Sequence, residues 1–349
     1  MSTAAARRSA PSAEGSGFAA MGEAFDVLIV GAGMSGLTAA RGLAATGRSV
    51  RVVDKGRGVG GRVATRRISD ATFDHGAQFF TARDPRFLAL VEQWVAEGAA
   101  SEWFRSSSGS GGNPRYRGTP TMTSIAKALS AGLDVVLSTR VESVRRVGDT
   151  DRAAWRVRFA DATEVEAGSV ILTPPVPQSL EILRSGEVVI ESQTRSLLES
   201  VEYAPCIAIM AVLNGPSRID PPGGIAPKPD DPAFPISWIS DNRQKGVSNV
   251  AAITIHASAA FSRENLQRDP KDVADALLSA ASPWLGSDAI EHQLHVWRYA
   301  RPTRFLDVGC VTVCASPALV VAGDACLGAR LEAAVLSGWA AASVCTTSL

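Results

Sequence analysis

The sequence predicts a mixed α/β fold in which a Rossmann-like, nucleotide-binding part is assembled from separated segments around an inserted α+β part built on an antiparallel sheet. Three observations support this prediction. After residue 24 the chain opens with an apolar run, a glycine-rich turn and a helical stretch; it closes with an apolar run, a loop and an Ala-rich helical stretch; and its composition changes after Val176. Strands and helices mixed in this order are typical of a parallel sheet with an insertion.

The elements expected before residue 176 follow from local patterns. Residues 26–30 are a short apolar run typical of a buried parallel strand, and residues 34–46 predict a helix that Gly47 ends. A second strand over 50–54 completes a βαβ unit. The remaining expectations are a helix over 84–97, a Ser/Gly-rich loop over 106–114, a helix over 121–131, and strands over 134–147, 154–160 and 169–175.

The second half of the chain predicts the insertion and the return to the nucleotide-binding part. The expected elements are two helices after Val176, strands over 206–213, 236–240, 249–256, 291–300 and 318–324, and helices over 270–281 and 331–344. We therefore assign residues 25–75, 132–175 and 300–349 to the nucleotide-binding domain, and residues 76–131 and 176–299 to a substrate domain. Residues 1–24, which are rich in Ala, Ser and Gly, are expected to be a disordered tail.

Composition excludes several classes of function. The formal net charge is +0, with 35 basic and 35 acidic residues, so neither nucleic acid nor a membrane surface is expected as a partner. Five cysteines without a close pair favour a reducing, cytoplasmic location, and four histidines without metal-ligand spacing predict no metal site. No apolar run approaches the roughly 18 residues that span a bilayer.

The turn GAGMSG carries the strongest motif. It follows a predicted strand, opens a predicted helix and is followed by Asp54 at the end of the next strand. In this context Gly31 permits the tight turn, Gly33 lets the backbone approach a pyrophosphate, and Gly36 allows close helix packing. Asp54 is expected to accept hydrogen bonds from an adenosine ribose.

A second glycine cluster, VVDKGRGVGGR, repeats the same spacing but does not predict a second nucleotide. Its first glycine, Gly56, comes two residues after Asp54, which leaves no room for another strand. The loop Gly60-Gly61-Arg62 is instead expected to bring backbone N–H groups and a guanidinium against the same pyrophosphate. The sequence therefore predicts one dinucleotide.

These motifs carry a family resemblance. GAGMSG, Asp54 and GGR, together with the C-terminal VAGDACLGARLEAAVLSGWAAA, resemble the glutathione-reductase-type FAD fold of the amine oxidase branch. More narrowly, DKGRGVGGRVATRR, DHGAQFFTARDPRF, YAPCIAIM, ISWISDN and HVWRYARP resemble the bacterial renalase-like FAD oxidoreductases, from about residue 25 to the end of the chain.

The resemblance implies a non-covalently bound FAD and names its contacts. The backbone of residues 76–79 is expected beside the isoalloxazine ring, and Val141 beside the adenine. The full set of implied cofactor contacts is Gly31, Gly33, Ser35, Gly36, Asp54, Lys55, Gly60, Gly61, Arg62, Ala77, Gln78, Val141, Gly323, Asp324 and Leu331. One departure is Glu332-Ala333-Ala334, where Glu-Gly-Ala is expected; Ala333 adds a methyl group where the helix is expected to pass closest to the cofactor.

The resemblance also implies the reaction. The substrate would be the 2- or 6-dihydro isomer of NAD(P), whose hydride passes to flavin N5, with O2 as the final acceptor giving NAD(P)⁺ and H2O2. Because flavin supplies the electronics, no side chain is assigned as a certain catalytic residue. The chain lacks both a second G-x-G-x-x-G unit and a redox cysteine pair, which disfavours pyridine-nucleotide and disulfide reductases.

Candidate substrate-pocket residues are Gly76, Ala77, Gln78, Phe79, His256, Trp297 and Tyr299. His256 ends an apolar strand and either binds substrate or is solvated; Trp297 and Tyr299 share one strand face and either wall the site or pack on the sheet. Arg298, Arg301 and Arg304 either bind substrate phosphates or lie on the surface, and Cys326 is either a covalent flavin link or structural.

Two alternative functions and the oligomeric state stay open at this point. A flavin amine oxidase or desaturase acting on another small molecule shares every FAD motif. Only turnover of substrate distinguishes it from an oxidase of dihydro-NAD(P). Escort-type proteins use a related fold without flavin, but Gly60-Gly61-Arg62 and Gly323-Asp324 speak against a non-enzymatic binding protein.

Overall fold

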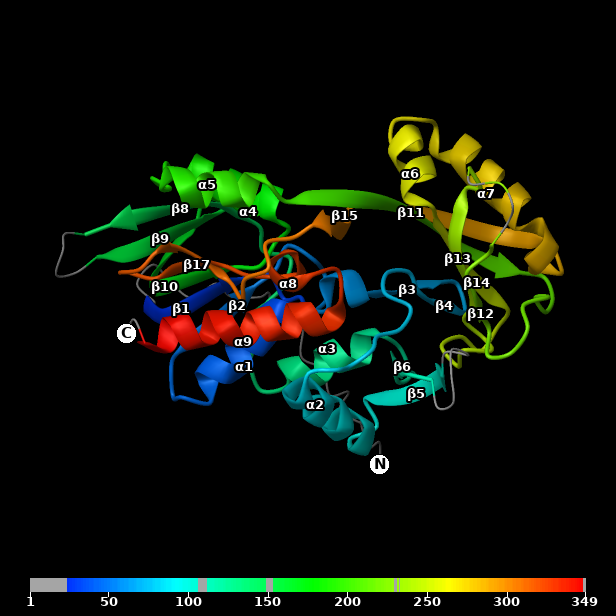
Figure 1. Ribbon diagram of the computed structural model, residues 1–349, viewed down its shortest axis with the longest axis horizontal. Helices are drawn as coiled ribbons and strands as arrows, with labels where there is room; N and C mark the ends of the chain where they lie inside the picture. The colour runs from blue at the N-terminus through cyan, green and yellow to red at the C-terminus, as the bar shows by residue number, and fades with distance from the viewer. Residues whose placement is uncertain (1–23, 106–111, 149–152, 229–230, 232, 348–349) are drawn as a thin grey trace, which may run out of the picture.

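The computed structural model describes the chain except for residues 1–23, 106–111, 149–152, 229–230, 232 and 348–349. The expected disordered tail and most of the expected loop over 106–114 lie outside the described residues. Two sheets joined by long strands form the body of the molecule (Figure 1).

The larger sheet has eight strands. Its centre is parallel and runs in the order β17-β10-β1-β2-β7, with bounds Leu319–Val321, Glu164–Leu172, Ala24–Val30, Val50–Val53 and Asp134–Val136. Antiparallel strands extend it: β16 (Val311–Cys314) lies beside β17, β9 (Ala154–Phe159) beside β10, and β8 (Val141–Val147) beside β9. The last residues of β1 and of β10 are fully buried apolar runs, as strands covered on both faces require.

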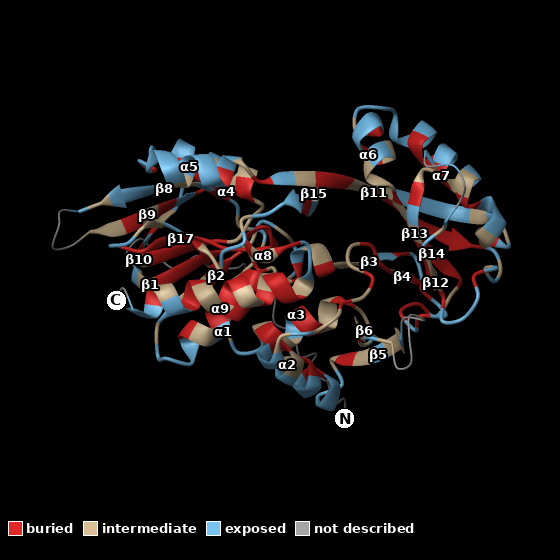
Figure 2. Ribbon diagram, in the orientation of Figure 1, coloured by how far each residue is buried: buried red, intermediate tan, exposed pale blue. Residues whose placement is uncertain are grey.

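Helices cover this sheet on both sides (Figure 1). On one side lie α1 (Met34–Ala44), α2 (Pro85–Ala96), α3 (Thr123–Ser130) and α9 (Leu331–Thr347), and on the other α4 (Val176–Ser185) and α5 (Ser192–Glu199). The short helix α8 (Asp324–Leu327) follows β17. Burial is concentrated in the strands and in the facing sides of α1 and α9, whereas α5 is largely exposed (Figure 2).

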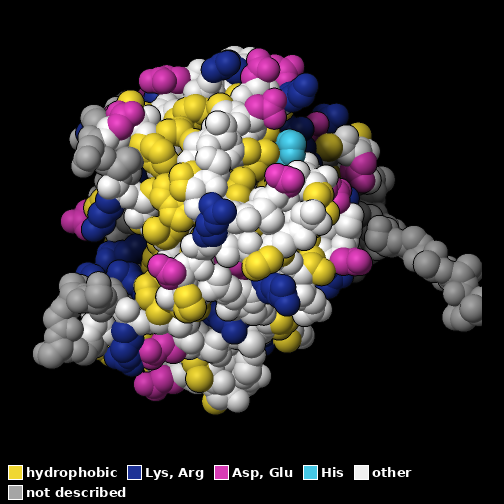
Figure 3. All heavy atoms as spheres, turned by 90° about the vertical axis from the view of Figure 1, so that its right-hand side faces the viewer, with side chains coloured by type: hydrophobic (Ala, Val, Ile, Leu, Met, Phe, Trp, Pro, Cys, Tyr) yellow, Lys and Arg dark blue, Asp and Glu magenta, His cyan; other side chains and the backbone are white. Residues whose placement is uncertain are grey.

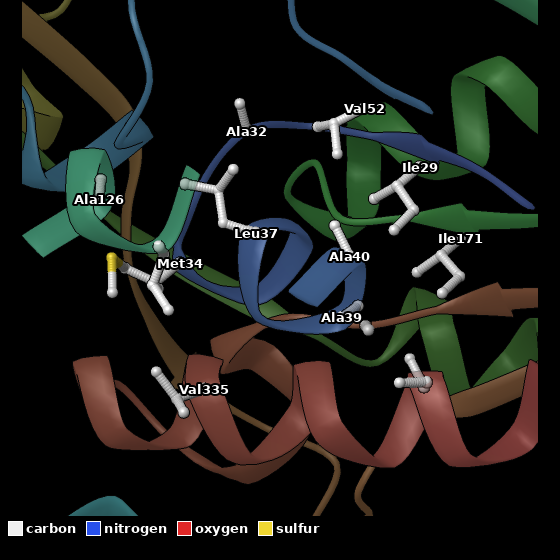
Figure 4. Packing of buried hydrophobic residues seen from close by; sticks show 14 of the residues in the cluster. Ile29, Ala32, Met34, Leu37, Ala39, Ala40, Val52, Ala126, Ile171 and Val335 are labelled. Carbon is white, nitrogen blue, oxygen red and sulfur yellow. The ribbon is translucent and has the colours of Figure 1, made fainter. Parts of the chain in front are cut away.

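Small residues let α1 and α9 approach closely. A Cβ atom added at Gly338 of α9 would lie 2.3 Å from the Ser35 carbonyl oxygen, and one at Gly42 of α1 would lie 3.3 Å from the Ala342 methyl group. Val335 of α9 and Leu37, Ala39 and Ala40 of α1 belong to the same buried cluster as strand residues of the sheet (Figure 4). This packing holds the N-terminus of α1 in place at the carboxyl end of β1.

The smaller sheet is antiparallel and has five strands in the order β12-β13-β14-β11-β15. Their bounds are Gly224–Ile225, Ile236–Asp241, Ala252–Ala257, Glu202–Leu213 and Ala289–Arg304. Helices α6 (Ala259–Asn265) and α7 (Pro270–Leu285) lie at this end of the molecule, where acidic and basic side chains are interspersed with apolar ones on the outer face (Figures 1 and 3). The long strands β11 and β15 extend from this sheet toward the larger one.

Two hairpins that the sequence analysis did not predict complete the fold. They are β3 (Thr65–Ile68) with β4 (Ala71–Asp74), and β5 (Ala100–Arg105) with β6 (Pro114–Gly118); a single 3₁₀ turn, η1, spans Gly61–Val63. The single strand predicted over 134–147 is wrong. The chain breaks at Ser138, which has φ +56°, so β7 pairs with β2 whereas β8 pairs with β9. Hydrogen bonds from the Ser138 and Thr139 amides to Gly56 and Asp54 carbonyls hold this break.

The other predicted helices and strands are present, with ends shifted by a few residues, whereas α6, α8, β12 and β16 were not predicted. Asp84 caps α2 by accepting hydrogen bonds from the Arg86 and Phe87 amides, at 2.9 and 3.4 Å. Among the described residues, no helix has the length and apolar character needed to cross a bilayer.

Candidate functional site

A cavity of about 590 Å³ lies between the two sheets. Its walls come from the N-terminus of α1, the η1 turn, residues 76–83, strands β6, β11, β14 and β15, and the segment from Gly323 to Ala334. Twelve of the residues proposed from sequence line it: Gly33, Ser35, Gly60, Arg62, Gly76, Ala77, Phe79, His256, Trp297, Gly323, Asp324 and Leu331. Motifs far apart in sequence are thus gathered around one cavity.

The other proposed residues lie outside the cavity lining and make structural contacts. A Cβ at Gly36 would lie 2.0 Å from the Gly31 carbonyl oxygen, so these two glycines allow the close turn from β1 into α1. The Lys55 ammonium donates to Gln178 Oε1 at 2.9 Å. Val141 begins β8, and Gly61 begins η1.

Tyr299 lies outside the lining although it shares a strand with Trp297. Its ring packs edge-on against Tyr203, with 5.4 Å between ring centroids. The pairing of β15 with β11 shifts register between Ala204 and Cys206, whose partners are Arg301 and Trp297, so Tyr299 lies within the irregular stretch. Side chains two residues apart on a regular strand face the same side, but the irregularity breaks this rule, so Trp297 lines the cavity and Tyr299 does not.

The start of α1 is suited to a phosphate group. Gly33 is the N-cap and has no side chain, and a Cβ placed there would meet nothing within 4 Å. The Ser35 hydroxyl oxygen is buried without a hydrogen-bond partner among the described residues. Unpaired N–H groups at a helix N-terminus attract anions, so an open cap beside a buried, unsatisfied hydroxyl fits a cofactor diphosphate.

Asp54 shapes the loop between the two glycine clusters. Its carboxylate accepts hydrogen bonds from the Ala32 and Gly56 amides, both at 2.6 Å. The Gly60 amide also donates to the Ala32 carbonyl oxygen at 2.8 Å. These bonds place the second cluster beside the first, in agreement with one nucleotide shared by both.

A bidentate ion pair between Arg62 and Asp324 forms another part of the cavity wall. The Arg62 guanidinium contacts the two carboxylate oxygens of Asp324 at 2.7 and 2.6 Å, and it also donates to the Ala300 carbonyl oxygen at 3.2 Å. A bidentate, charge-assisted pair fixes geometry as well as energy. It ties the η1 turn to the Gly323-Asp324 turn and to β15.

Residues 75–78 are held by hydrogen bonds on every side. The His75 carbonyl oxygen accepts from Trp297 Nε1 at 3.0 Å and contacts His256 Nε2 at 3.1 Å. The Ala77 amide donates to the Arg62 carbonyl oxygen at 2.9 Å, and a Cβ at Gly76 would lie 2.1 Å from that same oxygen. Only glycine fits there, so this segment of the cavity wall is rigid and exposes backbone.

A buried ion pair anchors the segment. Lys245 Nζ lies 2.9 Å from Asp74 Oδ2, and both side chains are 0% exposed. Asp74 Oδ1 accepts from the Thr65 hydroxyl at 2.8 Å and from the Met122 amide at 3.0 Å. Gln78, proposed from sequence as a pocket residue, is buried below the wall, where its amide donates to the Asp74 carbonyl oxygen at 2.7 Å.

Two histidines of this region are neutral at physiological pH. Burial, together with the positive charges of His295, Arg66 and His256, lowers the pKa of His75 to about 3. Burial also lowers the pKa of His256 to about 4, with Lys245 as the nearest positive charge that contributes. The His75 ring stacks on Trp297, with centroids 5.1 Å apart.

The cysteines near the cavity are protonated. Burial raises the pKa of the Cys206 thiol, which lines the cavity, to about 12, and that of the buried Cys326 thiol to about 11. Cys326 lies outside the main cavity lining, and its Sγ is 3.9 Å from the Val321 carbonyl oxygen. In the part of the chain that the structure describes, no three His, Cys, Asp or Glu side chains gather in a way that could hold a metal ion.

Sequence reasoning missed several cavity residues. Arg83, Arg115 and Arg330 line the cavity, and Arg115 also lies over the Phe79 ring at 5.1 Å. Of the three arginines proposed on β15, Arg298, Arg301 and Arg304, only Arg301 lines the cavity. Ala333 was expected to lie where α9 passes closest to the cofactor, but it is buried outside the cavity lining. Its neighbour Ala334 lines the cavity instead.

The parallel sheet and the open N-terminus of α1 beside the glycine loops are typical of a dinucleotide-binding protein. Comparison with known proteins gives its family. Residues 29–94 match the NAD(P)-binding Rossmann-like domain, and residues 96–346 match the family of flavin containing amine oxidoreductases. The second match covers most of the chain, so the protein belongs to the flavin containing amine oxidoreductases. It is an oxidoreductase whose cofactor is FAD.

Solved structures of putrescine oxidase variants have a similar fold. A triple mutant from a redesign of cofactor binding matches with a TM-score of 0.67 at 16% identity, over 92% of this chain and 98% of that chain. A single mutant matches with a TM-score of 0.67 at 15% identity, over 93% and 99% of the two chains. At this identity the likeness establishes the fold.

The first prediction concerns the buried ion pair. Lys245→Met leaves the Asp74 carboxylate buried without its cation, and we expect a loss of about 3–5 kcal/mol in the free energy of unfolding. Adding Asp74→Asn removes the stranded charge and is expected to recover part of that loss. Urea unfolding of the FAD-loaded variants measures both. Lys271→Met on the exposed start of α7 is the control, with an expected change within about 0.5 kcal/mol. A Lys245→Met protein as stable as wild type would contradict the prediction.

The second prediction concerns pH. His75 and His256 have pKa values of about 3 and about 4 in the folded protein, below the ordinary histidine value of 6.5. As pH falls below about 6.5 the unfolded chain binds protons that the folded protein does not, so stability falls with pH. Near pH 5 the two groups together contribute a slope of about 2.7 kcal/mol per pH unit.

Urea unfolding between about pH 7 and about pH 5 measures this slope. His256→Asn is expected to remove about half of it, and His292→Asn, at an exposed position on β15, none. Stability that stays constant or rises toward pH 5 would show that the two rings are not held neutral by folding.

Proposed function

We propose that the protein is a FAD-dependent oxidase of isomeric dihydronicotinamide dinucleotides, the 2- or 6-dihydro forms of NAD(P). The observation that carries the proposal is the charge of the cavity. Five arginines line it (Arg62, Arg83, Arg115, Arg301 and Arg330), and Asp324 is the one carboxylate among the described lining residues, so the net charge of the lining is +4. FAD brings two phosphate charges, which leaves an excess of about two positive charges for the substrate.

These arginines are available to a ligand. Arg62 is paired with Asp324, but none of the other four forms an ion pair with a described carboxylate. Arg83, Arg301 and Arg330 are exposed at the cavity rim, and Arg115 is partly buried. Guanidinium groups bind phosphate oxygens well, and the diphosphate of a dinucleotide substrate matches this excess charge.

The same charge disfavours a cationic amine. Putrescine, the diamine named for the structurally similar oxidases, carries positive charge at neutral pH, and a site for it needs a carboxylate or an aromatic cage. The lining offers no unpaired carboxylate in the described part of the chain, and its aromatic rings, Phe79, Phe80 and Trp297, share the cavity with the five arginines. Amine oxidation is nevertheless the alternative that membership of the family favours, and the experiment below includes it.

The bound FAD supplies the hydride acceptor, N5, and O2 with one proton then completes the balance, so that dihydro-NAD(P), O2 and H⁺ give NAD(P)⁺ and H2O2. A C–H hydride leaves with its electron pair, so the protein does not have to remove a proton. What the chain supplies is position: Trp297 and the backbone of 76–77 form one wall, and Phe79 another. The neutral His256 adds no charge at this wall.

We extend the proposal to the domains. Residues 25–75, 132–175 and 300–349 hold FAD, and residues 76–131 and 176–299 form the substrate side, except that α2, α3, α4 and α5 of these ranges pack on the larger sheet. Supporting this division, the parallel sheet and α1 carry the open helix N-terminus, whereas β11 and β14 carry Cys206 and His256 on the other side of the cavity. The proposed FAD contacts Gly33, Ser35, Gly60, Arg62 and Asp324 line the first side.

The third prediction tests the reaction class. FAD-loaded protein is mixed anaerobically with 2- and 6-dihydro-NAD(P), ordinary 4-dihydro-NAD(P), putrescine and monoamines, and the flavin absorbance near ~450 nm is followed. We expect rapid bleaching with the 2- or 6-dihydro isomers and little with the amines. Admission of O2 is expected to restore the colour with one H2O2 per turnover. Bleaching by amines alone would overturn the proposal in favour of the alternative.

The fourth prediction tests the arginine rim. Arg301→Gln removes one exposed phosphate contact, and we expect KM for the dihydro substrate to rise about tenfold with little change in kcat. The effect should shrink at high salt, because screening weakens the wild-type contact. Arg298→Gln is the matched control, since Arg298 is exposed on the same strand but outside the lining. Equal effects of the two variants would mean that the rim does not bind the phosphates.

A further inference from the structure

One ring nitrogen of His256 is committed to the protein. Its Nε2 lies 3.1 Å from the His75 carbonyl oxygen. A carbonyl oxygen only accepts hydrogen bonds, so Nε2 carries the proton and the neutral ring leaves Nδ1 as an acceptor. The same carbonyl accepts Trp297 Nε1 at 3.0 Å, and the rigid 75–78 segment therefore fixes the orientation of the ring.

The other ring nitrogen is left for the cavity. His256 lines the cavity with Nε2 turned toward His75, and no described residue donates a hydrogen bond to its Nδ1. Nor is Nδ1 among the buried atoms that lack a partner, so it is open to the cavity. A ligand that covers Nδ1 removes it from water, and because burying an acceptor without a partner is costly, a ligand with a donor at this point is favoured.

The two polar side chains of the cavity lining that lie beside His256 have their donors engaged elsewhere, whereas the unpaired Trp238 Nε1 on the neighbouring strand lies outside the lining. The Ser237 hydroxyl, which also lines the cavity, is within hydrogen-bond distance of the His256 and Ala257 carbonyl oxygens, at 3.2 and 3.0 Å. Trp297 Nε1 is engaged by His75. This part of the wall therefore presents an acceptor and no free side-chain donor from these three residues. A ligand group that carries N–H is complementary to it.

We propose that His256 Nδ1 accepts a hydrogen bond from the carboxamide NH2 of the dihydronicotinamide ring, and that the site thereby selects the amide over the corresponding carboxylate. This inference rests on the proposed function and names the group of the substrate that the wall recognises. A nicotinic acid ring has no N–H to donate and would bring a carboxylate oxygen against the nitrogen lone pair. Sites built to hydrogen-bond a substrate group reject the analogue that lacks it.

Two dinucleotides that differ only at this group provide the test. Binding of NAD⁺ and of its nicotinic acid analogue to the FAD-loaded protein is measured by flavin absorbance changes or calorimetry, and kcat/KM is measured for the corresponding dihydro forms. For wild-type protein we expect the amide to bind at least about tenfold more tightly and to react about 100-fold more efficiently.

Variants of His256 separate this role from a structural one. His256→Leu removes the acceptor, and the preference is expected to fall to within about twofold, because the amide loses its partner and the acid loses its repulsion. His256→Gln carries both a donor for the His75 carbonyl oxygen and an acceptor, so it should restore part of the preference. His292→Asn, at an exposed position, should leave it unchanged. The ratio of two ligands is the readout, which a general loss of folded protein does not move.

The outcomes distinguish the two proposals. If no dihydronicotinamide isomer bleaches the flavin, the proposed function fails and this inference falls with it. If the isomers bleach the flavin but wild-type protein binds both dinucleotides equally, or if His256→Leu keeps the full preference, the inference alone is overturned. Should His256→Leu not fold, the wild-type ratio and His256→Gln carry the test.

Discussion

The buried ion pair between Lys245 and Asp74 is the constraint on which the geometry of the cavity depends. Asp74 ends β4 and Lys245 lies in the turn after β13, so the pair joins the β3–β4 hairpin to the smaller sheet. The Asp74 backbone is also hydrogen-bonded to Asn242 and Thr254. Separating two charges that are fully removed from water leaves each of them unpaired at a cost of several kcal/mol. The start of the 75–78 segment therefore cannot move independently of the smaller sheet.

From this anchor the cavity wall follows in short steps. With Asp74 fixed, the His75 carbonyl oxygen meets His256 of β14 and Trp297 of β15, and the Ala77 amide meets the Arg62 carbonyl oxygen. Arg62 in turn holds Asp324 at the carboxyl end of β17. A chain of hydrogen bonds thus runs from the smaller sheet to the Gly323-Asp324 turn, which follows β17 of the larger sheet. Both sides of the cavity are positioned by the same network, as a site that aligns a cofactor and a substrate requires.

What the sequence predicted and what it missed have separate physical causes. The G-x-G-x-x-G turn, Asp54 and the Gly60-Gly61-Arg62 loop lie close together in sequence, and local spacing is enough to propose them, whereas Asp324 was proposed from the family resemblance. Arg115 and the Lys245–Asp74 pair depend on tertiary contacts over long separations, for which no local pattern exists. The β5–β6 hairpin is a local pairing that the sequence analysis missed. The strand predicted over 134–147 failed because apolar alternation does not register a break at Ser138, whose positive φ turns the chain from one pairing partner to another.

Family membership and substrate chemistry constrain different parts of this molecule. In the function that we propose, the helix N-terminus at Gly33, the Arg62–Asp324 pair and the peptide at Gly76 serve the diphosphate and the flat ring of FAD, whatever the substrate is. The discrimination between an amine and a dihydropyridine nucleotide falls instead to the side chains that face that ring. The charge excess of the arginines opposes an ammonium group, whereas a neutral acceptor on His256 suits an uncharged N–H group. In the function that we propose, the electrostatics of this wall, rather than the shared fold, decides which donor of electrons the protein accepts.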